Sequence, residues 1–103
     1  MLALEVELPE VGGLDQVEKI VEQTCTSRKL HMTVKVSLRS YPGSVHWHFR
    51  KAAKSGTLEV TFWEQERRLW LSVHVNREGE WTTTEMKALK TALDAEFMRR
   101  LGR

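Results

Sequence analysis

The chain has 103 residues, of which 41% are hydrophobic and 29% are charged, which is typical of one globular domain rather than a disordered or collagen-like chain. Sixteen basic and fourteen acidic residues leave a net charge of +2. No apolar run approaches the roughly 18 residues that a membrane span requires, and Glu5 and Glu7 stand where a signal peptide is basic. A single cysteine, Cys25, cannot form an internal disulfide. We therefore expect a single cytoplasmic domain over residues 1–103.

The first two predicted elements are a strand and a helix. Apolar and polar residues alternate over residues 2–8, which is the period of a half-buried strand, and Pro9 follows directly. Residues 14–26 then carry apolar side chains at helical spacing, with Asp15 and Glu18 in the first turn, where acidic groups complement the helix dipole. The sequence thus begins with a strand followed by an amphipathic helix.

Four further strands are predicted from the same two-residue alternation, over residues 32–39, 45–50, 58–63 and 69–76. Residues 41–44 (Tyr-Pro-Gly-Ser) predict a turn after the first of them, and the charged run 64–68 predicts a hairpin tip. In the first of these strands the alternation places Val34 and Val36 in the core, and Lys35 on the opposite face.

The final element is a helix over residues 82–101. Thr82 is predicted to cap it, with Glu85 reciprocating three residues later, and Gly102 is a stop signal. The order β-α-β-β-β-β-α predicts an α+β fold of two layers, an antiparallel sheet with two helices packed on one face. This element order resembles that of the TATA-binding-protein-like and helix-grip folds, in topology alone. A cystatin-like sheet wrapped on the first helix is the alternative.

If the helices cover one face, the opposite face of the sheet is open. Strand parity assigns to it Lys35, Arg39, His46, His48, Arg50, Glu59, Trp63, Trp70 and His74. Large exposed rings commonly mark a contact surface, so Trp63 and Trp70 are candidate anchors for a partner, with Arg68 at their edge. His46 and His48 on the same face are further candidate partner contacts. The alternative is local packing, because pairing Phe62 with Leu69 would put Arg68 opposite Trp63, within reach of a cation–π contact.

Charge is distributed unevenly along the chain. Residues 1–27 carry one base against six acids, a balance of −5, whereas residues 28–54 carry seven bases and no acid. Bases interleaved with aromatic rings suit a polyanion, so Lys35, Arg39 and Arg50, together with His46 and His48, are candidate contacts to nucleic acid. Alternatively, the acidic first strand and helix neutralise this stretch within the fold.

His46 and His48 project from one face of the same strand, a spacing that metal sites use. Keeping Phe49 opposite Leu58 places Glu59 across from His48, which makes a site of these three side chains possible. The same pairing puts His74 two strands from His46, too distant to share an ion. The alternative is a plain cross-strand pair of His48 and Glu59.

No arrangement of residues in the sequence requires catalysis. Cys25 falls on the apolar side of its helix, and no serine, histidine and aspartate combine in a recognisable pattern. We therefore expect a non-catalytic protein-interaction module without a cofactor, which associates with a protein partner or with itself through the open face. Polyanion binding, and a metal protein or enzyme centred on His46, His48 and Glu59, are the alternatives.

Overall fold

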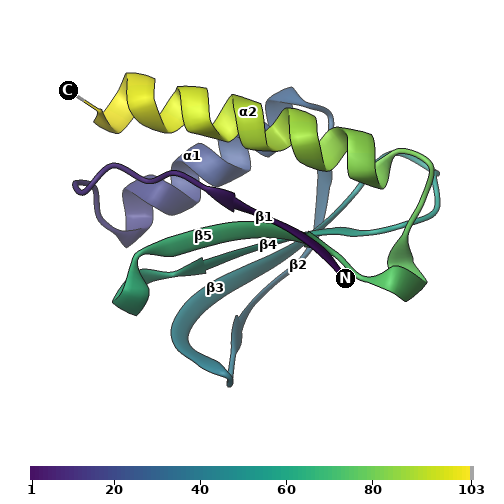
Figure 1. Cartoon of the computed structure of the whole chain (residues 1–103), viewed down its shortest axis with the longest axis horizontal. Helices are drawn as coiled ribbons and strands as arrows, with labels where there is room; N and C mark the ends of the chain where they lie inside the picture. Colours follow the sequence, from purple (N-terminus) through teal and green to yellow (C-terminus); the bar gives the residue numbers. More distant parts are fainter. Residues whose placement is uncertain (103) are drawn as a thin grey trace.

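The structure, a computed structural model, describes residues 1–102 and confirms the predicted α+β architecture. Its elements are β1 (Leu2–Val6), α1 (Leu14–Ser27), β2 (His31–Leu38), β3 (Tyr41–Arg50), β4 (Leu58–Trp63), β5 (Arg68–Val73) and α2 (Thr82–Leu101), with short 3-10 turns η1 (Glu64–Glu66) and η2 (Val75–Arg77). The five strands form one antiparallel sheet in the order β1-β5-β4-β3-β2. Both helices lie on the same side of this sheet, as Figure 1 shows.

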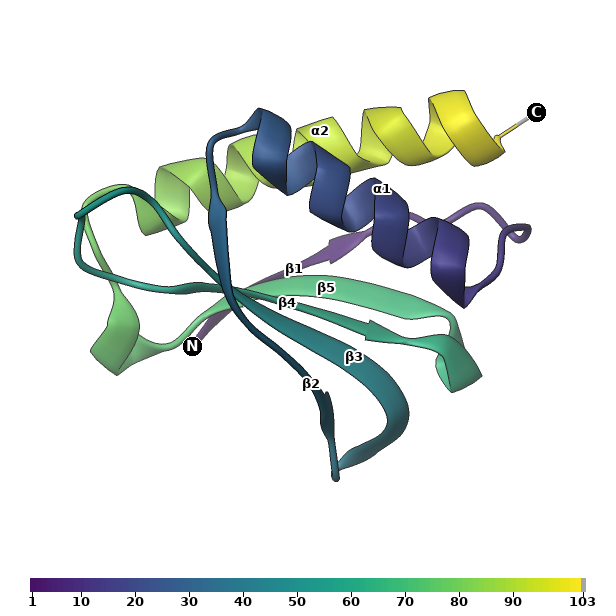
Figure 2. The same cartoon turned by 180° about the vertical axis from the view of Figure 1, so that it is seen from behind.

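The core fills the space between the helices and the covered face of the sheet. Trp47 and Phe49 of β3 are buried there with Ile20 of α1 and Phe97 of α2. The reverse view shows the β2–β3 hairpin bending away from the helices (Figure 2), so the outer part of the sheet has less cover. Over residues 1–102, neither helix has a stretch long and apolar enough to cross a membrane.

The predicted pairing of the central strands is confirmed. The cross-strand partners are Phe49–Leu58, His48–Glu59, Phe62–Leu69 and Trp63–Arg68. Burial of the apolar partners sets this register, because a slip of one residue would turn each of them toward the open face. The first strand, whose place in the sheet was not predicted, pairs with β5 at one edge.

The predicted orientation of β2 was wrong. The ladder with β3 shifts between Met32 and Val34, so that Val34 and Val36 lie opposite His48 and His46 on the open face. Lys35 consequently points to the helix side. A bulge adds one residue to a strand and reverses the parity of everything after it, and the alternation in the sequence continues through it without interruption.

The predicted turn at residues 41–44 and the predicted capping box of the last helix were also wrong. The turn after β2 is formed by residues 39–40, and Pro42 and Gly43 belong to β3, at a second register shift. Thr82 is the first residue of α2 and exchanges hydrogen bonds with Gly79. Glu85 therefore does not close a capping box with it. Its carboxylate, which is 4% exposed, pairs instead with side chains from the α1 and β3 ends.

Candidate metal centre

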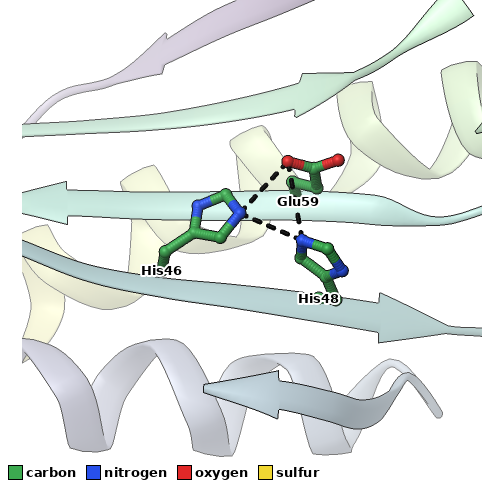
Figure 3. Close-up of side chains that lie close together, drawn as sticks. All are labelled: His46, His48 and Glu59. Carbon is green, nitrogen blue, oxygen red and sulfur yellow. Dashed lines mark hydrogen bonds and ion pairs between the residues drawn. The ribbon is translucent and has the colours of Figure 1, made fainter. Parts of the chain in front are cut away.

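The centre of the open face holds two histidines and one glutamate that approach each other closely. His46 and His48 alternate along β3 with the core residues Trp47 and Phe49, so both rings project from the open face. Glu59 lies directly across from His48 on β4. Figure 3 shows the three side chains converging in front of the sheet, with the helices behind it. Two adjacent strands in register therefore suffice to bring them together.

The atoms facing each other are His46 Nε2, His48 Nε2 and Glu59 Oε1, which we call the ligand triangle. Its sides measure 3.1 Å between the two ring nitrogens, 3.1 Å from His46 to Glu59, and 3.7 Å from His48 to Glu59. Ligand atoms bound to a tetrahedral zinc ion at about 2.0–2.1 Å stand roughly 3.3 Å apart. The triangle thus has the dimensions of one face of a tetrahedral coordination shell.

Glu59 carries a charge in an unusual setting. It is 4% exposed, and among residues 1–102 its side-chain partners are histidines, with no lysine or arginine within ion-pair distance. Burial lowers the pKa of His46 and of His48, so both imidazoles are neutral at pH 7. A buried carboxylate requires a compensating charge, and neutral rings supply only dipoles and lone pairs.

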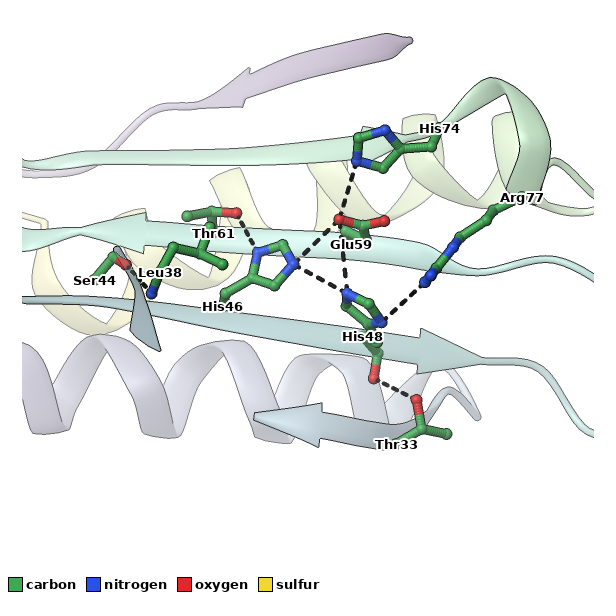
Figure 4. Close-up of polar contacts among 9 residues, drawn as sticks. All are labelled: Thr33, Leu38, Ser44, His46, His48, Glu59, Thr61, His74 and Arg77. Carbon is green, nitrogen blue, oxygen red and sulfur yellow. Dashed lines mark hydrogen bonds and ion pairs between the residues drawn. The ribbon is translucent and has the colours of Figure 1, made fainter. Parts of the chain in front are cut away.

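Contacts behind the rings fix their orientation. His46 Nδ1 lies 2.8 Å from the hydroxyl oxygen of Thr61, its cross-strand neighbour. When Nδ1–H donates to that oxygen, the lone pair of Nε2 points into the ligand triangle, which is the tautomer a metal needs. The guanidinium of Arg77, which can only donate, lies 3.4 Å from His48 Nδ1. Figure 4 shows both contacts flanking the triangle.

His74 is closer to the site than its strand position predicts. Its Nε2 lies 3.3 Å from Glu59 Oε1, the same oxygen that faces the other two histidines (Figure 4). Among the described residues the close group of possible metal ligands is His46, His48 and Glu59 without His74, which agrees with the prediction that His74 is too distant from His46 to share an ion. Its contact with Glu59 arises because β5 ends at Val73. The next residues leave the ladder for the turn η2, so the ring can turn back toward β4. His74 is nearly half exposed and holds the carboxylate from outside.

The predicted aromatic anchors lie beside this site and pack on one another. The ring of Tyr41 stands edge-on to Trp63 at 5.0 Å and to Trp70 at 5.2 Å between centroids. Trp63 also donates its indole N–H to the carbonyl of Pro42, at 3.0 Å. Arg68 lies 4.9 Å over the ring of Trp70, not of Trp63 as predicted. Since both tryptophans are half-buried, these intramolecular contacts occupy much of their surface.

The three predicted anion contacts do not form one patch. Lys35 lies on the helix side, where its ammonium pairs with Glu22 at 2.7 Å and Glu18 at 3.5 Å. Its pKa is raised by the hydrogen bond to Glu22. Arg39 and Arg50 are exposed, at the two ends of the β2–β3 hairpin. For Lys35, the predicted neutralisation of the basic stretch by the acidic first helix is therefore confirmed.

Two side chains at the site were not predicted from the sequence. Thr61 could have been found, because parity places it opposite His46 on β4. Arg77 could not, since it lies in a turn outside the strand pattern. No family model, curated protein or solved structure matches the chain.

Proposed function

We propose that this protein binds one divalent transition-metal ion, with zinc as the reference ion, through the ligand triangle. The observation that carries the proposal is the separation of the three atoms, 3.1, 3.1 and 3.7 Å. Two imidazoles and one carboxylate are a donor set that zinc uses in sites with an open fourth position. Imidazole nitrogens also favour zinc, copper or nickel over magnesium and calcium.

A plain hydrogen-bonded pair explains the same contacts less well. Each neutral histidine carries a single N–H. If His46 donates its proton to Thr61, and His48 Nδ1 accepts from Arg77, only the His48 proton lies within the triangle. The 3.1 Å contact between His46 Nε2 and Glu59 Oε1 then brings two lone pairs together. If Thr61 instead donates to His46 Nδ1, His46 Nε2–H can donate to Glu59, but the N–H groups of His46 and His48 then meet at 3.1 Å. A cation between these atoms removes the repulsion and compensates the charge of Glu59.

Titration of metal-free protein with Zn²⁺ or Co²⁺ tests the proposal. After dialysis against a chelator, calorimetry should show one ion bound per chain, and cobalt should give the intense visible absorption of a four-coordinate site. His46→Ala and Glu59→Gln should each lose this binding. His31→Ala is the matched control, because His31 is exposed and lies outside the site. Absence of stoichiometric binding, or equal loss in the control, would contradict the proposal.

The protein-interaction and polyanion hypotheses stay predictions. Self-association through Trp63 and Trp70 predicts a dimer in sedimentation experiments that Trp70→Glu disrupts, and a monomer at high concentration would argue against it. Nucleic-acid binding predicts an affinity that falls with salt and weakens in Arg39→Ala. The cytoplasmic location also stays a prediction. The packing of the aromatic rings on one another, and of Lys35 on α1, favours metal binding over both hypotheses.

A further inference from the structure

A solvent-open recess of about 330 Å³ adjoins the ligand triangle. Its lining residues are His48, Glu59, His74, Asn76 and Arg77, so it opens onto the buried carboxylate and one of the two ligand rings. The triangle supplies three ligands, and a tetrahedral ion needs a fourth. An ion in the triangle therefore has a position for an external ligand, and this recess is the adjoining space.

Arg77 is the cationic side chain of this recess. It is exposed, and within residues 1–102 no carboxylate lies within ion-pair distance of it; its side-chain contact is His48 Nδ1 at 3.4 Å. A metal bound at His48 Nε2 requires the ring proton to sit on Nδ1. Two donors would then face each other, and Arg77 would lose its acceptor. Metal binding thus releases a guanidinium beside the ion.

The charges of the loaded site call for an anion. A divalent ion and the Glu59 carboxylate leave +1, and Arg77 raises the total to +2, since histidines that bind a metal are neutral. The ion and the guanidinium carry like charges at the same recess, so they repel each other. An oxyanion can accept two hydrogen bonds from the planar guanidinium and still offer an oxygen to a metal.

We propose that the metal-loaded site binds a small oxyanion, a carboxylate or a phosphate group, with one oxygen on the open position of the ion and the others on Arg77. This proposal rests on the metal site proposed above and adds the class of its external ligand. His74 keeps its contact to Glu59 in this arrangement and so acts as a positioning residue for the carboxylate ligand.

The test uses protein loaded with one equivalent of Co²⁺ and freed of excess metal by gel filtration. Inorganic phosphate and acetate are titrated in separate arms at constant ionic strength, and the visible cobalt bands and the heat of binding are recorded. We expect at least one probe to shift the bands, because the anion replaces water on the ion. The tighter probe identifies whether the site prefers phosphate or carboxylate.

Arg77→Met should weaken binding of that probe at least about tenfold, the usual effect of losing charge-assisted hydrogen bonds, while cobalt remains bound. Arg39→Met is the matched control, since it removes the same charge at the far turn of the hairpin. Bands that neither probe changes, or equal probe affinity in Arg77→Met and wild type, would overturn the inference while the metal site stands. Failure of Co²⁺ to bind would overturn the metal site itself.

Discussion

Replacing Glu59 by glutamine should abolish the stabilisation that zinc confers on the folded protein. The substitution keeps the size of the side chain and removes its charge, which is both the anionic ligand of the site and the charge that needs compensation. A ligand that binds only the folded state raises the free energy of unfolding by about 2.7 kcal/mol at a free concentration of 100 times its Kd. In the Glu59→Gln variant, zinc should raise the free energy of unfolding by almost nothing.

The expected shift in melting temperature follows from the size of the chain. For 103 residues the entropy of unfolding near 60 °C is roughly 0.2 kcal/mol/K. A gain of about 2.7 kcal/mol therefore corresponds to a rise in Tm of about 12 °C. The measurement is thermal unfolding followed by far-ultraviolet circular dichroism, with zinc at 100 times the measured Kd and with chelator.

Glu85→Gln provides the control, because Glu85 is also 4% exposed but pairs with Arg28 and Lys51 far from the triangle. Loss of the Glu85 charge should lower the free energy of unfolding by about 1–2 kcal/mol. The value is kept at this size because both partners are one-third exposed, so water screens the ion pairs. The zinc shift should persist in this variant. A zinc shift of wild-type size in Glu59→Gln would refute the reasoning, whatever the stability of the variant.

Three further predictions concern the Cys25 thiol, the Arg67 side chain and the two histidines of the ligand triangle. Burial raises the pKa of the Cys25 thiol to about 12, so native protein should resist iodoacetamide at pH 8 and react only on unfolding; rapid alkylation would contradict this. Arg67 donates to the carbonyls of three residues in the loop before α1, and Arg67→Ala should lower the free energy of unfolding in urea by about 1–3 kcal/mol; an unchanged midpoint would count against it. Burial lowers the pKa values of His46 and His48, so protons compete less with the metal for both rings. Two histidines of ordinary pKa would cost about threefold in calorimetric zinc affinity between pH 7.5 and 6.5, and the fall should be smaller here; an equal or larger fall would contradict this.

The part of the site that the sequence predicted is the part that strand pairing controls. Keeping Phe49 opposite Leu58 brings Glu59 across from His48, and β3 parity puts His46 on the same face. This placement holds because Phe49 and Leu58 are both buried, and only one register of β3 and β4 keeps them so. The sequence therefore placed the three members of the ligand triangle together as one possible site, beside the alternative of a plain His48–Glu59 pair, and did not predict the distances between their atoms.

The features that the sequence did not predict lie where regular pairing stops. The bulge in β2 turns Lys35 toward α1, and no residue in the sequence marks its position. Arg77 reaches the site from the turn after β5, where alternation no longer tells which way a side chain points. Parity placed His74 on the open face, but its contact with Glu59 depends on the end of β5 at Val73. The place of β1 beside β5 is a long-range contact that its own residues do not specify.

The division of the ligand triangle between β3 and β4 has a consequence for folding. A slip of one residue between these strands would turn Glu59 away from both histidines, because successive side chains point to opposite faces. An ion that needs all three groups can bind only the native alignment. Metal binding would thus stabilise the native register of β3 and β4 selectively. Chains with misaligned strands would lack the free energy of metal binding.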